Sequence, residues 1–562
     1  MCASRIHPFF NYFFMKHRIS IFVLLFTFVT AAAQQVSFKE MMRVKKSFET
    51  AGNIQGKAAE YIPVLVKKDT LAYVFNYKNA FVVISTREFL PPVKAYSFEN
   101  GLYKGDDNGF SFFDFIKSDY RSFMKNRGKD GAFEEKNRKA WHSPLFEESK
   151  EQYGPLLSSL FGQVNCRDEN NHLINVTNLF TPHNYAVGCV AITFTEVLHY
   201  FKWPRIGTGS HSYTDNSGST TGSHSVNYEA AYINWTNILD EYYKKPSTST
   251  QRSELGKLAY NCAVAVNMDF EYNGATSNIN RIPSAANKYY RYTASYIEKS
   301  NSGFWAKVDS NIIHSLPVQF AIYTSSGAGH AVVGDGLKFQ NNGTRYYHLN
   351  MGWWGSSNGW YNIQGSFNAG GYSNITAAVV DMIPVPEMGK PKVNPDDEVV
   401  NLEWFYSQKI KPESYELQVK IGSANWLTVD SNITAASYKY KYTSTDLHRF
   451  RVRAKYNGKR AQNGWSQYES IDIEKAINDF YPEDLLVYPT VTLDAINVEY
   501  KYLSGSTIAV FDASGTRIYY EEIDSDANLG KRTIPMGTFA PGMYFVRVYG
   551  NGNSLTKKFI KL

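Results

Sequence analysis

The chain has 562 residues, which at about 150 residues per domain corresponds to about four folded units. Aromatic residues, mostly Tyr and Phe, make up 15% of the composition, and this favours β-rich architecture over a helical bundle. The net charge of +7 is small for this length, and no block of Lys and Arg concentrates it. The composition therefore argues against a nucleic-acid-binding protein.

The N-terminus has the pattern of an export signal. A basic cluster at 16–18 precedes an apolar run at 19–29, and three alanines follow. This pattern predicts a signal peptide over residues 1–33, with Met15 as the natural start. The apolar run is too short to remain as an anchor, and no later segment approaches about 18 consecutive apolar residues. We therefore expect an exported mature protein without a transmembrane segment.

Removal of the signal peptide leaves three cysteines, Cys166, Cys189 and Cys262. An odd count leaves at least one free thiol, and in a secreted protein an unpaired cysteine is a candidate reactive group. For Cys166 and Cys262 the sequence leaves two alternatives open, a disulfide or two buried thiols.

The first folded unit is predicted between residues 34 and 125. Apolar segments such as 71–77 and 80–85 alternate there with polar turns and helix-like stretches, which is typical of a small α+β unit. The next stretch, 126–139, is polar, charged and glycine-containing, as exposed linkers are. We therefore expect a processing segment between 126 and 150.

A larger unit, predicted over residues 151–384, carries the candidate chemistry. Apolar residues recur at helical spacing after Cys189, while Gly188 permits a sharp entry and Pro204 closes the segment. Cys189 is thus predicted in the first turn of a helix, where the helix N-terminus and a nearby imidazolium lower the pKa of a thiol. From this helix alone, a small buried apolar cysteine is an equally good interpretation.

A second motif supplies a candidate base. His330 directly precedes an apolar strand, and glycines such as Gly329 let a substrate backbone approach closely. His330 follows Cys189 at a separation of the order found in papain-like enzymes. Twenty residues later, Asn350 is expected to orient the imidazole through a side-chain hydrogen bond, and Trp353 to shield that bond from water. The pattern predicts nucleophile, base and orienter.

The motifs GCVA around Cys189, GHA around His330 and NMGWWG from Asn350 resemble those of the streptopain family of papain-like cysteine peptidases. The resemblance covers about half of the chain. It implies that the side chain of Gln163 forms an oxyanion hole with the backbone N–H of Cys189. Residues expected to bind substrate are Gly188, Gly329 and Trp353.

The sequence departs from the family pattern at three positions. Phe161 and Met351 stand where the family usually has Trp, and Glu196 stands where Gln is usual. None of these changes removes a catalytic atom, so they bear on subsite preference and on packing beneath the active site. The resemblance also implies that Cys262 is a packing residue in a helix that borders the substrate groove.

The N-terminal unit resembles the propeptide of the same family, on the strand and turn pattern of residues 71–101. This implies a latent zymogen whose segment 34–150, the propeptide with its processing linker, inhibits the enzyme until it is cut away.

Two further units follow. Four prolines between 384 and 395 predict a stiff connector. The alternating strands beyond it resemble a fibronectin type III sandwich over residues 385–478, a kind of module that usually spaces or binds. Residues 479–562, with DLLVYPTV, IAVFDASG, GMYFVRVYG and a KKFIKL ending, resemble the sorting domain of the type IX secretion system of Bacteroidota. This implies passage through the outer membrane, followed by release or surface attachment.

The sequence thus predicts an α+β protein, in which a papain-like catalytic domain follows a small α+β propeptide and precedes two all-β sandwich domains. The expected function is that of a secreted cysteine endopeptidase, with a Cys189 thioester and His330 as general base and acid. The expected partners are protein or peptide substrates, the chain's own propeptide and the type IX secretion machinery.

No metal or organic cofactor is expected, because scattered histidines such as His199, His314 and His348 lack ligand spacing. Two alternatives belong to other classes of protein. One is a surface adhesin or binding protein that kept the peptidase fold without turnover. The other is a thiol amidase or acyltransferase that acts on non-protein amides.

Overall fold

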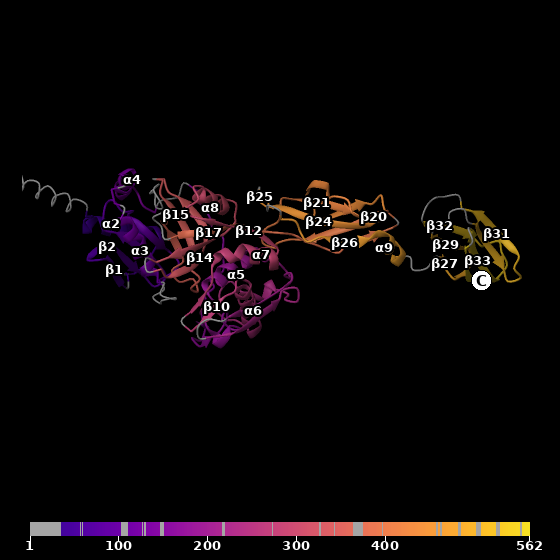
Figure 1. Ribbon diagram of the computed structural model, residues 1–562, viewed down its shortest axis with the longest axis horizontal. Coiled ribbons are helices and arrows are strands. Elements are labelled where there is room, and N and C mark those ends of the chain that lie inside the picture. Colours follow the sequence, from indigo (N-terminus) through magenta and orange to yellow (C-terminus); the bar gives the residue numbers. More distant parts are fainter. Residues whose placement is uncertain are drawn as a thin grey trace, which may run out of the picture.

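The computed structural model describes residues 35–562 except 57, 59, 103–110, 126, 129–130, 147–150, 216–219, 273, 325–326, 342, 364–374, 396, 457–458, 461–463, 481–484, 502–506, 524–528 and 551–552. The expected signal peptide and Met15 lie outside the described residues. Within the described part, none of the helices combines the length and apolar character needed to span a bilayer. Figure 1 shows the N-terminal unit, the larger unit and two β-modules following one another in chain order. The larger unit comprises residues 151–384 and carries the candidate catalytic residues, and we call it the catalytic unit.

The N-terminal unit is an antiparallel meander of four strands with helices on both faces. Every residue of β3 is buried, because Val82 and Ile84 pack toward helix α2 while Phe81 and Val83 pack toward helix α3. The Ser37 hydroxyl caps α2 by accepting from the backbone N–H of Glu40 at 3.1 Å. The elements are α2 (Phe38–Ala51), β1 (Glu60–Val66), β2 (Asp69–Asn76), β3 (Phe81–Ser85), β4 (Val93–Ser97) and α3 (Phe112–Lys125).

The stretch 126–139 is not the exposed linker that its composition suggests. It contains most of helix α4 (Gly131–Trp141), whose buried residues recur at helical spacing. The Asn137 side chain donates to Phe89 O at 2.8 Å, and the Trp141 indole donates to Leu90 O at 3.1 Å. The expectation of an exposed linker at 126–139 is therefore wrong, because these contacts make the stretch part of the N-terminal fold. The expected processing between 126 and 150 stays a prediction.

The N-terminal unit and the catalytic unit share one sheet of eleven strands. Strand β4 pairs antiparallel with β16, so that Tyr96 lies opposite Trp360 and Ala95 opposite Tyr361. The strand order is β1-β2-β3-β4-β16-β15-β14-β13-β17-β12, and β5 pairs with β14. The remaining strands are β5 (Glu151–Tyr153), β12 (Tyr292–Glu298), β13 (Val318–Tyr323), β14 (Gly329–Phe339), β15 (Arg345–Asn350), β16 (Gly359–Tyr361) and β17 (Ile375–Pro384).

The catalytic unit sets helix α5 (Cys189–Phe201) against this sheet. Helix α5 packs on α6 and β14, and all of its residues after Cys189 are buried. A helix in which most residues are apolar is typically buried on every side. The other elements are β6 (Cys166–Arg167), β7 (Leu173–Ile174), η1 (Pro182–Asn184), β8 (Ser210–Asp215), β9 (Gly222–Asn227), η2 (Trp235–Asn237), α6 (Ser249–Ala265), β10 (Asp269–Glu271), β11 (Gly274–Thr276), η3 (Ile279–Arg281), α7 (Ile282–Tyr289) and α8 (Phe304–Ile313).

Two β-modules follow, each with two sheets. In β24 buried and half-buried residues alternate strictly, as expected for one face on a sandwich core. The first, which we call the middle module, spans residues 387–472 and comprises β18 (Glu387–Met388), β19 (Lys392–Asn394), β20 (Val399–Phe405), β21 (Ser414–Ile421), β22 (Leu427–Ile433), β23 (Ser437–Lys441), β24 (Leu447–Tyr456), β25 (Lys459–Arg460) and β26 (Glu469–Asp472).

Helix α9 (Ile473–Phe480) follows the middle module, and the last module has a separate hydrophobic core. Its strands are β27 (Leu485–Tyr488), β28 (Val491–Thr492), β29 (Ala495–Lys501), β30 (Thr507–Asp512), β31 (Arg517–Glu522), β32 (Leu529–Pro535), β33 (Gly542–Gly550) and β34 (Asn553–Lys561). The expected class is confirmed: the chain is α+β at its N-terminal side and all-β in its last two modules.

Candidate active site

Cys189 is the first residue of helix α5, as the sequence predicts. Gly188 precedes it with φ of 92°, a conformation that side chains rarely adopt. A Cβ on Gly188 would lie 2.6 Å from the sulfur of Met268, so a larger residue here would also have to displace that side chain. Gly188 therefore sets the entry of α5 and packs against Met268. It is absent from the described residues that line the pocket, although the sequence assigned it to substrate binding.

His330 is the second residue of β14, and its imidazole is fixed from two sides. Its Nε2 lies 2.8 Å from the carbonyl oxygen of Met351. Since a carbonyl only accepts, Nε2 carries the proton in this contact and Nδ1 is the basic nitrogen of the neutral ring. The Trp353 ring stacks on the imidazole with centroids 4.9 Å apart. Trp353 thus covers the imidazole itself, whereas the sequence assigned it to shield a bond between Asn350 and His330.

Cys189 and His330 line one pocket of about 350 Å³. One wall comes from β11 and the residues after it, 275–279, and the other from β13 and the start of β14. Gly329 also lines the pocket, and a Cβ there would lie 2.8 Å from the ring of Tyr323. The structure therefore brings together the helix-borne thiol, the strand-borne imidazole and a glycine that packs closely against Tyr323.

Asn350 does not orient the imidazole in the expected way. Its side-chain Nδ2 donates to Ser159 O at 2.8 Å, and its Oδ1 accepts from the backbone N–H of Gly352 at 3.1 Å. Met351 lies between Asn350 and Gly352 in the sequence, and its carbonyl oxygen accepts the hydrogen bond from His330. The expectation of a direct side-chain bond is wrong, because Asn350 is used to shape the turn that presents this carbonyl.

The Met351 carbonyl is the site component that sequence reasoning missed. The backbone N–H of Met351 donates to the Asn358 side chain at 2.8 Å, so two asparagines hold the peptide groups on either side of it. A backbone carbonyl has no residue-type signature. The available signal was the sequence Asn-Met-Gly at the end of an apolar strand, because an Asn side chain readily bonds the backbone two residues on.

The Gln163 segment lies beside the entry of α5. Gln163 is buried, and its carbonyl accepts from the backbone N–H of Val187 at 2.9 Å. Gly162 forms a β-bridge with Trp353. Gln163, which the sequence assigns to the oxyanion hole, therefore lies between the residues that lead into Cys189 and the turn that carries Trp353.

Glu196 links helix α5 to the segment that carries Gln163 and to the turn around Met351. It lies fully buried in α5, its Oε1 accepts from the backbone N–H of Phe161 at 3.3 Å, and its carboxyl is hydrogen-bonded to the Asn350 side chain. Burial raises the pKa of Glu196 well above its usual value, and the charge of Asp335 raises it further, while the two hydrogen bonds lower it. Burial therefore favours the neutral, protonated form of Glu196 in the folded chain.

The raised pKa of Glu196 predicts how the stability of Glu196→Gln, relative to wild type, changes with pH. Above its ordinary pKa of 4.5 the unfolded chain releases the proton while the folded chain keeps it, so wild-type stability falls as pH rises from 4.5 toward the folded-state pKa. Glutamine has no such proton. We expect the variant to melt at a higher temperature than wild type at pH 7 to 8, with the difference disappearing near pH 4, in thermal unfolding at a series of pH values. The control is Glu169→Gln on the exposed surface; an equal pH dependence in both variants would contradict the buried acid.

Among the residues that the structure describes, no group of three or more His, Cys, Asp or Glu side chains is arranged to hold a metal ion. Cys166, Cys189 and Cys262 are all free thiols, so the open question of a Cys166–Cys262 disulfide is answered in favour of two buried thiols.

Comparison with known proteins gives two family matches. The model of the Peptidase C10 family matches residues 169–361, and that of a secretion system C-terminal sorting domain matches residues 486–562. Streptopain from Streptococcus pyogenes is 26% identical over 337 residues, which cover 56% of this chain and 80% of streptopain. The thiol protease/hemagglutinin PrtT from Porphyromonas gingivalis is 23% identical over 389 residues, 65% of this chain and 42% of PrtT.

Among solved structures, a prointerpain A fragment from Prevotella intermedia covers 59% of this chain and 99% of that fragment, with 22% identity and a TM-score of 0.41. Active interpain A from the same organism covers 41% of this chain and 95% of its own, with 24% identity and a TM-score of 0.35.

The family matches identify the chain as a cysteine peptidase. Its catalytic unit is a Peptidase C10 family domain, the family of streptopain. Its last module is a type IX secretion sorting domain, which directs the protein through the outer membrane for secretion or attachment at the cell surface.

Proposed function

We propose that this protein is a secreted cysteine endopeptidase made as a zymogen, with Cys189 as nucleophile and His330 as general base and acid. One observation carries the assignment: the first residue of α5 and the second residue of β14 line the same pocket, and Met351 O and Trp353 hold the imidazole. A cysteine with only a packing role would not require, in the same pocket, a histidine whose Nε2 is held by a hydrogen bond.

The mechanism uses the groups of this chain alone. Nδ1 of His330 takes the proton from Sγ of Cys189, and the thiolate adds to the substrate carbonyl carbon. The resulting oxyanion accepts from the backbone N–H of Cys189 and the side-chain amide of Gln163, and each such donor contributes about 3 kcal/mol. The imidazolium then protonates the leaving amine, which leaves a thioester. His330 next takes a proton from water, whose oxygen displaces the thiolate and releases the acid.

Contacts of residues 34–150, which we call the prosegment, support the zymogen part of the proposal. The backbone N–H of Ser357 donates to Gly101 O at 2.8 Å, on the turn that also carries Trp353. At the neighbouring strand Lys94 is buried, and its ammonium pairs with Asp119 and donates to Asn362 O. The prosegment thus binds the edge of the sheet next to the turn that carries Met351 and Trp353. The described residues that line the pocket all lie outside the prosegment.

We propose the domain division 34–150, 151–384, 385–478 and 479–562. Because α4 is folded into the prosegment, we place the activating cut after Trp141, between 142 and 150. Removal of the prosegment then separates β4 from β16, and the turn around Trp353 loses its contact with Gly101.

A thiol-labelling experiment tests the proposed function. Burial raises the pKa of the Cys166 and Cys262 thiols to about 12, so about one molecule in 10⁵ carries either thiolate at pH 7. We expect one equivalent of iodoacetamide to modify Cys189 alone, as read by peptide mass spectrometry, and to remove casein hydrolysis by the processed enzyme in step with labelling. Full activity after complete labelling of Cys189 would exclude it as the nucleophile. A processed chain that never cleaves casein would favour the adhesin or amidase alternative.

A further inference from the structure

The four-proline segment that begins at the last residue of β17 does not act as a free connector. Pro384, Val385 and Pro386 are all buried. The backbone N–H of Val385 donates to Arg291 O at 2.7 Å, and its carbonyl accepts from the Trp203 indole at 3.1 Å. The chain therefore leaves the catalytic unit as a bound segment.

The middle module reaches the far end of the catalytic helix. Ser407 of the module is fully buried, and its hydroxyl donates to the carbonyl of Phe201, the last residue of α5. The last carbonyls of a helix lack partners within it, and burying them unpaired costs stability. Helix α5 begins at Cys189, so one helix carries the nucleophile at its first residue and a module contact at its last.

Charged and aromatic groups bind the two parts from a second direction. The guanidinium carbon of Arg205 lies 3.6 Å from the ring centroid of Phe405, and Arg205 Nη2 lies 3.3 Å from Oε1 of Glu387. Glu387 and Phe405 are also paired with each other across β18 and β20. Arg205 thus contacts two adjacent strands of the module at once.

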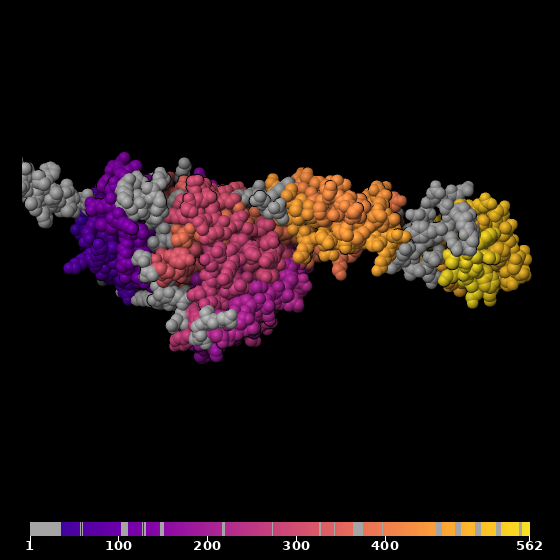
Figure 2. Space-filling model, in the orientation of Figure 1, coloured from indigo at the N-terminus to yellow at the C-terminus, as the bar shows by residue number. Residues whose placement is uncertain are grey.

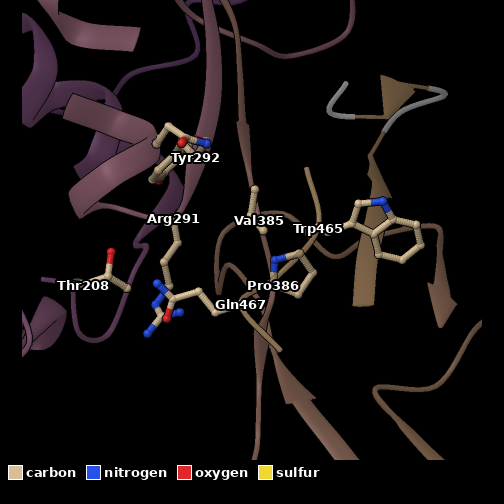
Figure 3. Close-up of a pocket in the computed structure, with 8 residues that line it drawn as sticks. Thr208, Arg291, Tyr292, Val385, Pro386, Trp465 and Gln467 are labelled. Atoms are coloured by element: carbon tan, nitrogen blue, oxygen red, sulfur yellow. The ribbon is translucent and has the colours of Figure 1, made fainter. Parts of the chain in front are cut away.

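Apolar packing is continuous across the junction. One buried cluster contains catalytic-unit residues such as Phe201 and Trp203 together with module residues such as Leu402, Trp404 and Leu417. Figure 2 shows the orange module lying directly against the catalytic unit. In Figure 3, Val385 and Pro386 lie between Arg291 and Tyr292 on one side and Trp465 on the other, around a pocket of only about 50 Å³. The last module, by contrast, has a core of its own.

We propose that the middle module is an integral part of the peptidase fold, which stabilises the end of the catalytic helix and unfolds together with the catalytic unit. It is not a tethered spacer. The inference rests on packing and not on the proposed chemistry, so it can be tested on an inactive chain.

The test places a core defect in the module and observes the catalytic unit. In full-length Cys189→Ala protein, Cys262 is a fully buried thiol of α6, so its labelling by iodoacetamide during heating reports unfolding of the catalytic unit. Leu417→Ala truncates a fully buried side chain of β21 in the module core. We expect Leu417→Ala to lower the labelling midpoint of Cys262 by about 5 to 10 °C.

The matched control is Leu485→Ala, because Leu485 is a buried leucine in the separate core of the last module. We expect the Cys262 midpoint to be unchanged in that variant.

Should Leu417→Ala prevent folding altogether, Ser407→Ala removes only the hydroxyl that caps α5, and we expect a smaller decrease of the Cys262 labelling midpoint. Hydrogen exchange in β21 and β24 checks that the module itself is loosened. A loosened module with an unshifted Cys262 midpoint overturns the proposal.

Discussion

The Cys189→Ala protein is expected to remain at full prosegment length and to cleave casein at least about 10³-fold more slowly than wild type. Alanine keeps the helix entry but removes the only sulfur in the pocket that His330 lines, among the residues described. Self-shortening and casein hydrolysis should disappear together, because one nucleophile serves both reactions. The measurement is a time course of both under mild reduction, starting from Gln34.

The control for this prediction is Cys166→Ala, which removes a buried thiol from the same domain. It should shorten and hydrolyse casein at rates close to wild type. If Cys189→Ala shortens normally when purified without other proteases, the cut is not made by this thiol and the zymogen proposal fails. If an added protease removes the prosegment of wild type and casein still stays intact, the peptidase mechanism fails.

The His330→Ala protein is expected to lose about 10² to 10⁴ in kcat/KM, since the ring supplies both the base and the acid of the cycle. The two asparagines that hold Met351 should behave differently. Asn350→Ala and Asn358→Ala each remove one support of the peptide around the Met351 carbonyl, so we expect similar and smaller losses, about tenfold in kcat, with little change in KM.

Comparison of these three variants separates two ways of orienting the imidazole. A direct side-chain bond would make Asn350→Ala far more damaging than Asn358→Ala. Orientation through the backbone makes the two alike, because both act on Met351 O, which lies 2.8 Å from His330 Nε2. A large loss in Asn350→Ala with an unaffected Asn358→Ala would therefore contradict the backbone arrangement. The experiment is steady-state kinetics on a short peptide substrate with each prosegment removed.

Local patterns predicted the elements that carry the candidate site. Cys189 begins a helix and His330 lies near the start of a strand, as the spacing of apolar residues indicates. Such patterns are reliable because the period of burial follows from the backbone geometry of each element. The prediction failed at 126–139, where frequent charges and glycine concealed the helical spacing of Phe133, Ala140 and Trp141.

The sequence by itself determined the class of protein, the order of its modules, and the thiol and imidazole on which the mechanism depends, since these reside in residue types and short-range spacing. Only the tertiary structure decided that Met351 O, rather than Asn350, holds His330, that β4 of the prosegment extends the catalytic sheet, and that Ser407 closes α5. Each of these involves a backbone group in contact with a residue distant in sequence or presented by a folded turn. Backbone groups are alike in nearly every residue, so no residue pattern marks which of them will meet.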